Sequence, residues 1–224
     1  MKPIIYQLLP RTFTNYNETR RHNGTLQENG SGTLNAITPK ALRAIRDLGA
    51  THVWYTGVIR HATAQYNTPA IVKGKAGSPY AITDYYDIDP DLCEDKRHRM
   101  QEFTQLVERS HHANLKVIID FVPNHVAREY HSTCKPKGVV DLGANDNPEW
   151  AFSPLNNFYY MGEPFAPHFD VEGYQENPAR ATGNDCFTAH PSKDDWYETV
   201  KLNYGVFYQG GGEKQFDPIP DTWH

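Results

Sequence analysis

The sequence predicts an α/β fold in which a parallel sheet is followed by a large irregular segment. Short runs rich in Val, Ile and aromatic residues alternate with stretches of helical periodicity up to about residue 121. From residue 126 to residue 222 this alternation stops, and Gly, Pro and Asn are frequent without a clear helical period. An ordinary connection has about 4 to 6 residues, so a segment of this length predicts an inserted subdomain.

The first 57 residues are predicted to form a strand, a helix and a second strand. Residues 4–9 are a short apolar run that is typical of a buried strand. The helix is expected to begin at Thr38, a good N-cap residue, followed by Pro39 in the first turn. The second strand, residues 51–56, reads "THVWYT" and is β-branched and aromatic. The apolar residues of the helix recur at helical spacing: Ala41, Leu42, Ile45 and Leu48.

The pattern then repeats once. Residues 57–95 are predicted to form a long polar loop, and residues 96–113 an amphipathic helix. Residues 115–121, "LKVIIDF", form the third predicted strand. Its nearly continuous apolar character is typical of a parallel sheet that is covered on both faces.

Charge and composition exclude several classes of protein. The net charge is −5 without a basic block, which argues against a nucleic-acid partner. No run of 18 apolar residues predicts a membrane span, and the N-terminus lacks the features of a signal peptide, which favours a cytoplasmic location while leaving the compartment open. The three cysteines, widely spaced and odd in number, indicate unpaired thiols in a reducing compartment.

Polar side chains gather where the third predicted strand ends. Asp120 closes the strand, and Asn124 and His125 follow in the next loop. Polar residues at the carboxyl ends of parallel strands face the ligand crevice in α/β folds. A carboxylate buried there without partners would cost several kcal/mol. Two interpretations stay open: these residues form a binding site, or Asp120 caps its own loop and His125 is a satisfied core histidine.

Five stretches resemble one known family in the expected order. "DFVPNH" resembles the D-x-V-x-N-H motif of the α-amylase family of glycoside hydrolases. The other stretches are "IIYQLLPRTF", "LGATHVWYTGVI", "GSPYAITDYYDIDPDL" and "VKLNYG", so the resemblance covers most of the chain. It implies a partial TIM (β/α)8 barrel of about the first three βα units, with an irregular subdomain inserted after strand three. Residues 1–125 would then belong to the barrel and residues 126–222 to the inserted subdomain.

The resemblance also implies roles for four substrate-binding residues. Tyr80 matches the aromatic residue that lies against a glucose ring, and sugars stack on aromatic faces because both are apolar there. His125 matches the residue that hydrogen-bonds a glucose hydroxyl. Asp120 matches a carboxylate that orders the floor of the site, together with an arginine expected beyond this chain. Asp84 matches the aspartate of the tyrosine loop.

The same resemblance implies that the catalytic carboxylates are not in this chain. Retaining glycoside hydrolysis needs two carboxylates about 5 Å apart, and the family's G-F-R-x-D motif is absent. Asp217 and Asp221 lie in a proline-rich turn, so we expect no catalytic residue in this chain and no activity from it alone. The expected partners are an α-glucan or maltooligosaccharide and the rest of a catalytic domain beyond His224. The alternatives are a transglycosylase or isomerase of this family, and a non-catalytic relative that binds a sugar or a partner.

A calcium ion is the one cofactor to consider. Asn124 matches a residue that binds structural calcium in many family members, and calcium needs 6 to 8 oxygen ligands. Where the family supplies an aspartate, this chain has Lys201. A lysine ammonium repels calcium and could take its place, whereas nearby carboxylates could compensate, so both outcomes stay open. These carboxylates are Asp170, Asp185, Asp194 and Asp195.

The inserted segment is rich in aromatic residues. Half of the chain's Phe, Trp and Tyr residues lie between Trp150 and Tyr208. They suit the wall of a carbohydrate cleft, but a small subdomain also needs aromatic residues for its own core. For any one of them, the core interpretation is favoured.

Overall fold

The computed structural model describes residues 2–210. Asp217 and Asp221 lie outside the described residues. The chain forms two compact units. The first unit comprises the residues up to His61 together with Tyr85–Phe121, and the second comprises Ala62–Asp84 together with the residues from Val122 onward.

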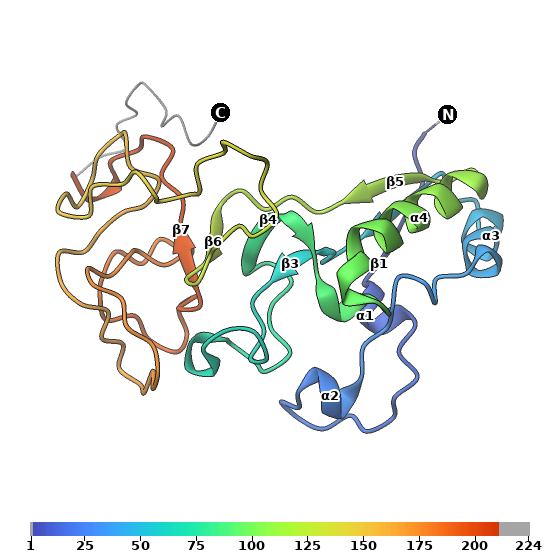
Figure 1. The fold of residues 1–224 in the computed structure, drawn as a ribbon, viewed down its shortest axis with the longest axis horizontal. Helices are drawn as coiled ribbons and strands as arrows, with labels where there is room; N and C mark the ends of the chain where they lie inside the picture. The colour runs from blue at the N-terminus through green and yellow to red at the C-terminus, as the bar shows by residue number, and fades with distance from the viewer. Residues whose placement is uncertain (1, 211–224) are drawn as a thin grey trace. The chain divides into compact units, whose positions relative to one another are not determined.

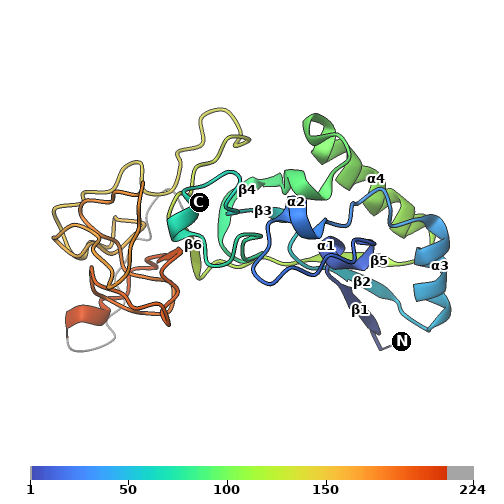
Figure 2. The same ribbon diagram turned by 90° about the horizontal axis from the view of Figure 1, so that it is seen from below.

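The first unit contains a three-stranded parallel sheet. Its strands are β1 (Ile5–Leu8), β2 (His52–Tyr55) and β5 (Lys116–Ile119), in the order β1-β2-β5. Figure 1 labels β1 and β5, and Figure 2 labels all three strands. The register aligns Ile5 with His52, and His52 with Lys116. The α/β arrangement with parallel strands, predicted from the alternating sequence pattern, is therefore confirmed.

Two longer helices accompany this sheet. In α3 (Pro39–Asp47) the Thr38 hydroxyl accepts a hydrogen bond from the Ala41 N–H at 3.2 Å, so the predicted cap is present. The turn η3 (Lys96–His98) leads into α4 (Arg99–His112), which packs along β5 (Figure 2). Two single-turn helices precede them, α1 (Pro10–Phe13) and α2 (Leu26–Asn29). Within the described residues, every helix is too short or too polar to cross a bilayer.

The strands are less buried than the sequence suggested. Ile5 of β1 is 50% exposed and Ile119 of β5 is 41% exposed, whereas Leu8 is buried. The reason is that β1 and β5 are the two edges of the sheet in the part of the chain described, so each has one neighbouring strand. The expectation of a third strand covered on both faces is wrong for these residues.

The segment predicted as a polar loop contains regular structure. β3 (Ile59–His61) and β4 (Ile82–Ile88) form a two-stranded sheet, and the turns η1 (Pro69–Ile71) and η2 (Pro90–Leu92) flank β4 in the chain. β4 holds a buried charge, Asp87, which is paired with Arg60 at 3.1 Å and with Arg99 at 2.6 Å. The polar composition predicted a loop, and this prediction is wrong because the charges are paired with residues that are distant in the sequence.

The second unit is irregular, as predicted for most of residues 126–222. Its sheet consists of β6 (His125–Ala127) and β7 (Thr199–Lys201), which run antiparallel with His125 opposite Lys201. A short turn, η4 (Tyr208–Gly210), ends the described part. In this irregular unit, side chains bond backbone groups that a sheet would otherwise pair. The Asp146 carboxylate, for example, accepts hydrogen bonds from the backbone N–H groups of Asn157 and Phe158 at 2.7 and 3.0 Å. All three cysteines are free.

The aromatic residues of the second unit divide into two groups. Phe158, Tyr159 and Tyr160 are buried and form its core, as the favoured interpretation predicted. Trp150 and Trp196 are exposed, at 60% and 46%. The aromatic composition of the segment therefore serves two purposes, and only the exposed rings remain candidates for contact with a ligand.

Candidate functional site

The second unit contains a cavity of about 710 Å³. A cavity of this size is in the range of about 300–1,000 Å³ typical of small-molecule sites. Its walls come from segments that are far apart in the sequence. The lining residues are Lys73, Ser78, Tyr80, Val122, Asn124, His125, Gly183, Asn184, Asp185, Trp196, Glu198 and Thr199.

Tyr80 is placed on this cavity by a tight turn. The Ala81 N–H donates to the Ser78 carbonyl at 3.1 Å, and the Ser78 hydroxyl accepts from the Tyr80 N–H at 3.3 Å. The chain enters the turn at Gly77, where a Cβ would lie 1.8 Å from the Ala62 carbonyl oxygen and φ is +75°. Only glycine fits there. Tyr80 itself remains 41% exposed, so its ring is accessible.

His125 lies at the start of β6 and is buried. Its Nδ1 accepts a hydrogen bond from the Asn124 side-chain amide at 2.9 Å, which leaves the ring proton on Nε2. The Trp196 ring meets the imidazole edge to face at 5.3 Å between centroids. Burial lowers the pKa of His125, the positive charge of Lys201 adds to this, and a hydrogen bond with the Tyr80 backbone opposes it. The imidazole is therefore neutral near pH 7.

Asn124 is the centre of a hydrogen-bond network in the second unit. Its Nδ2 donates to His125 and also to the Gly183 carbonyl at 2.8 Å. Its Oδ1 accepts from the Lys201 ammonium at 3.1 Å, which fixes the orientation of the amide. A Cβ at Gly183 would come within 2.8 Å of the His125 side chain, so only glycine allows this close approach. The network holds the imidazole in one position and one tautomer.

The residues around Asn124 do not fit a calcium ion. The Lys201 ammonium lies 2.7 Å from the Asp185 carboxylate as well as 3.1 Å from the Asn124 Oδ1. Both oxygens therefore already face a positive charge. A dication would have to displace a lysine that is itself buried, and calcium needs 6 to 8 oxygen ligands.

Asp120 lies in the first unit, directly after β5. Its carboxylate accepts hydrogen bonds from the Trp54 indole N–H and, at 3.0 Å, from the Gly57 backbone N–H. The carboxylate thus ties the end of β5 to the residues that follow β2. Sequence reasoning placed Asp120 correctly at the end of a strand but did not identify Trp54 as its partner.

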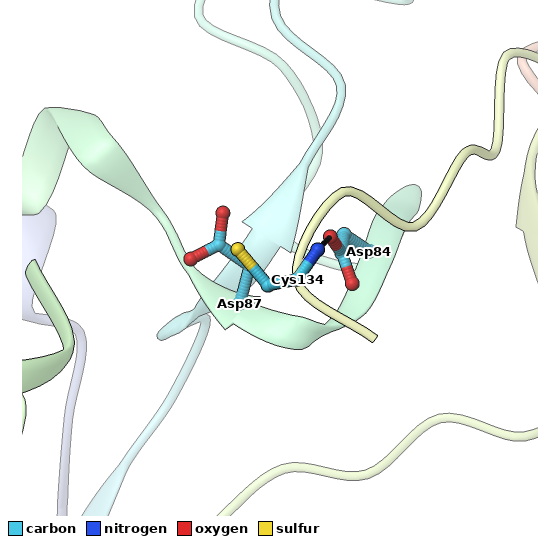
Figure 3. A group of neighbouring side chains, drawn as sticks. All are labelled: Asp84, Asp87 and Cys134. Atoms are coloured by element: carbon cyan, nitrogen blue, oxygen red, sulfur yellow. Dashed lines mark hydrogen bonds between the residues drawn. The ribbon is translucent and has the colours of Figure 1, made fainter. Parts of the chain in front are cut away.

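Asp84 is completely buried in β4. Its Oδ2 accepts from the Thr133 N–H at 2.6 Å and from the Thr133 hydroxyl at 3.1 Å. It also accepts from the Cys134 N–H at 3.0 Å, the contact drawn as a dashed line in Figure 3. These contacts fasten the start of the inserted segment to β4. Asp84 does not line the cavity, whereas Tyr80, Asn124 and His125 do.

The cavity also contains residues that sequence reasoning did not assign to a site. Glu198 and Lys73 come from loops that share no motif with the rest of the site. Trp196 was indicated only by the aromatic composition of the insertion. Together with Tyr80 and His125, these residues offer aromatic surface, a neutral imidazole and a carboxylate. Such a set suits a neutral, hydroxyl-rich ring compound.

Comparison with known proteins supports a single family. Residues 7–177 match the family model described as the catalytic domain of alpha amylase. The chain is 29% identical over 147 residues to maltase 1 of Drosophila virilis, covering 66% of this chain and 19% of that protein. It is 29% identical over 163 residues to trehalose-6-phosphate hydrolase of Bacillus subtilis strain 168, covering 73% of this chain and 22% of that protein. The chain thus spans about a fifth of the length of these relatives.

One solved structure supports the fold. The debranching enzyme of Nostoc punctiforme superposes with a TM-score of 0.52, covering 91% of this chain and 36% of that one. The sequence identity is 21%, so this likeness concerns the fold alone.

Proposed function

Because the chain belongs to the alpha-amylase catalytic-domain family, we propose that it is part of a glycoside hydrolase acting on the α-glucosidic bonds of starch-like glucans. The reaction would proceed with retention of configuration, by two carboxylates about 5 Å apart. This chain would supply sugar recognition, and the carboxylates would come from the rest of the catalytic domain. The observation that supports the proposal best is the cavity of about 710 Å³ that Tyr80 and His125 share.

The proposed architecture is a partial (β/α)8 barrel. Residues 1–125 would form about three βα units, and residues 126–222 the subdomain inserted after strand three. The half-exposed Ile119 on the edge strand β5 supports this, because an edge strand with apolar side chains needs a further neighbour. The remaining strands would supply that neighbour, and also the arginine expected beside Asp120.

In the proposed site, Tyr80 stacks on a glucose ring and His125 binds one of its hydroxyls. The imidazole is suited to this role because it is neutral and Asn124 fixes its tautomer. Its Nε2–H would exchange the Tyr80 backbone for the sugar hydroxyl when the ligand binds. Asp84 would act by holding the segment at residues 133–134 within the second unit, and Asp120 by tying the end of β5 to the residues after β2 within the first.

Replacing Tyr80 by alanine is expected to weaken the binding of maltooligosaccharides to the chain about tenfold, because the stacking surface is lost. NMR titration with maltotriose measures the affinity. Tyr16→Ala is the matched control, since Tyr16 is 87% exposed and does not line the cavity. Equal affinities of the Tyr80 variant and the wild type would remove Tyr80 from the site.

We further propose that the Lys201 ammonium takes the place of the family's calcium ion. The expected result is that EDTA leaves the melting temperature of the chain unchanged. Lys201→Met is expected to lower it, because Asn124 Oδ1 and Asp185 lose their partner. A large drop of the wild-type melting temperature in EDTA, restored by added calcium, would contradict the proposal.

The test of the hydrolase proposal is whether the longer protein has the catalytic carboxylates. A downstream strand bearing an arginine and an aspartate two residues apart, followed by a glutamate on the next strand, would support an enzyme. Product analysis of the longer protein on maltooligosaccharides, with the anomeric configuration determined by NMR, would separate retaining hydrolysis from transfer. A downstream sequence without these carboxylates would leave a sugar-binding relative instead.

A further inference from the structure

We propose that a second cavity in the second unit binds a small organic carboxylate at Arg180. The volume of this Arg180 cavity is about 240 Å³, just below the range of about 300–1,000 Å³ typical of small-molecule sites, so it suits a ligand of few atoms. It shares no lining residue with the cavity at Tyr80 and His125, so a ligand here is independent of the proposed sugar binding. The lining of the Arg180 cavity includes Pro148, Phe158, Tyr160, Glu176, Asn177 and Arg180.

Arg180 brings a positive charge with an unused hydrogen-bond donor to this cavity. Its Nε and Nη2 donate to the Glu176 Oε2 at 3.2 and 2.7 Å, and Nη2 also donates to the Arg128 carbonyl at 2.8 Å. Its Nη1 has no hydrogen-bond partner within residues 2–210. Nor is Nη1 one of the enclosed side-chain atoms that lack a partner there, so it keeps access to a ligand. A guanidinium N–H in this state is a strong donor for a carboxylate.

Glu176 has no oxygen left for the Arg180 Nη1. Its Oε1 accepts from the Arg128 guanidinium and from the Arg180 backbone N–H, both at 2.6 Å. Its Oε2 accepts from the Tyr174 hydroxyl at 2.6 Å, in addition to the two bonds from Arg180. One carboxylate therefore faces two guanidinium groups, and this cluster keeps an excess positive charge. Such a charge attracts an anion more strongly when it is largely enclosed by protein than when it is in water.

Asp146 is a second carboxylate within the field of Arg180, and its oxygens are used elsewhere. They accept hydrogen bonds from the backbone N–H groups of Asn157 and Phe158 and, at 2.9 Å, from the Tyr160 hydroxyl. Burial raises the pKa of Asp146, although these hydrogen bonds and the charge of Arg180 act in the opposite direction. In the described part of the chain Asp146 forms no ion pair with Arg180. It reduces the positive charge from a distance and leaves Nη1 open.

The other walls of the Arg180 cavity offer further donors and apolar surface. Asn177 lines the cavity, and within residues 2–210 neither its side-chain amide nor its backbone N–H has a hydrogen-bond partner. Phe158 and Tyr160 are buried aromatic residues, and Pro148 is exposed. Donor groups beside a positive charge select an anion, and apolar walls favour one that carries a short hydrocarbon group. A carboxylate with a few carbon atoms has both properties.

The test is an NMR titration of the 224-residue chain with propionate, 1-propanol and inorganic phosphate at constant ionic strength. Propionate is expected to shift the signals of the Arg180 Nε–H and the Asn177 backbone N–H in a saturable way. It is also expected to bind at least about fivefold more tightly than 1-propanol, which lacks the charge, and than phosphate, which lacks the hydrocarbon group.

A substitution at the edge of the cavity keeps the arginine network intact. Pro148→Glu is expected to weaken propionate binding at least about fivefold, because it adds a negative charge beside the site. Leu155→Glu is the matched control, since Leu155 is 61% exposed, does not line the cavity and should leave propionate binding within about twofold. Pro148→Glu is preferred to a change of Arg180 itself, which would also remove a partner of Glu176.

Each of the other outcomes overturns the proposal. The absence of a saturable shift at Arg180 and Asn177 would reject a ligand in this cavity. Equal affinities for 1-propanol and propionate would show that the positive charge selects nothing, and equal affinities for phosphate and propionate would reject an organic ligand. Equal propionate binding by Pro148→Glu and Leu155→Glu would place the anion elsewhere on the chain.

Discussion

Replacing Glu176 by alanine is expected to destabilise the second unit by about 3–5 kcal/mol, the usual cost of leaving a buried charge without its partner. Glu176 lies between two arginines: its Oε1 is 2.6 Å from Arg128, and its Oε2 is 2.7 Å from Arg180. The Tyr174 hydroxyl donates to the same carboxylate at 2.6 Å. The Arg128 guanidinium is fully buried, so without Glu176 its charge would be left with neutral backbone carbonyls, those of Tyr197 and Arg180.

Urea unfolding of the variant measures this loss. Glu163→Ala is the matched control, because Glu163 is 55% exposed, its contact with His190 is 3.5 Å, and the expected change is within about 0.5 kcal/mol. An unfolding midpoint of the Glu176 variant equal to that of the control would show that the arginines find other partners.

The same network predicts how stability depends on acid. Burial alone would raise the pKa of Glu176, but the charges of Arg180 and Arg128 outweigh it and bring the pKa down to about 2. Because the folded pKa is below the ordinary value of 4.5, this stabilisation is complete above about pH 5 and is lost as the pH falls toward 2. The variant should lack this part of the acid dependence.

The parallel sheet could be predicted because its signals are local. Apolar runs such as residues 117–119 and a capped helix at Thr38 depend on neighbours in the sequence, and both are present in the structure. The order β1-β2-β5 then follows from strands that are joined by helices.

The sequence could not predict structure that depends on distant partners. β4 contains Asp84 and Asp87, and it was interpreted as part of a polar loop. It is a buried strand because Arg60, Arg99 and the residues at 133–134 satisfy its carboxylates. Which arginine meets which aspartate is a property of the fold, and no local pattern encodes it.

The residues of the candidate site could likewise be predicted only in part from the sequence. The family resemblance singled out five residues: Tyr80, Asp84, Asp120, Asn124 and His125. The structure places Tyr80, Asn124 and His125 on one cavity, and Asp84 and Asp120 do not line it. The resemblance also drew attention to Lys201, which contacts Asn124. Glu198 carried no signal, because it lies in none of the stretches that resemble the family. Family membership is confirmed, while the role of each residue remains a prediction.

Replacing Asp120 by alanine is the second change with a large expected effect, a loss of about 2–4 kcal/mol in the stability of the first unit. The carboxylate accepts two hydrogen bonds, from the Trp54 indole and the Gly57 N–H. Bonds to a charged group contribute up to about 3 kcal/mol each, and less where the group is only partly buried, as Asp120 is. Glu108→Ala is the control, since Glu108 is exposed on α4 and should change stability little.

Hydrogen exchange at Gly57 makes this prediction specific. Gly57 is buried, and its N–H donates a hydrogen bond to Asp120. This amide hydrogen should therefore exchange faster in Asp120→Ala, and its exchange rate should be unchanged in Glu108→Ala. Trp54→Phe removes only the indole donor and should cost less, because the Gly57 bond remains. A double-mutant cycle between Trp54 and Asp120 then isolates the indole bond. Additive effects and unchanged exchange at Gly57 would mean that the carboxylate does not tie the two strand ends together, and that its place at the end of β5 has a purpose other than support.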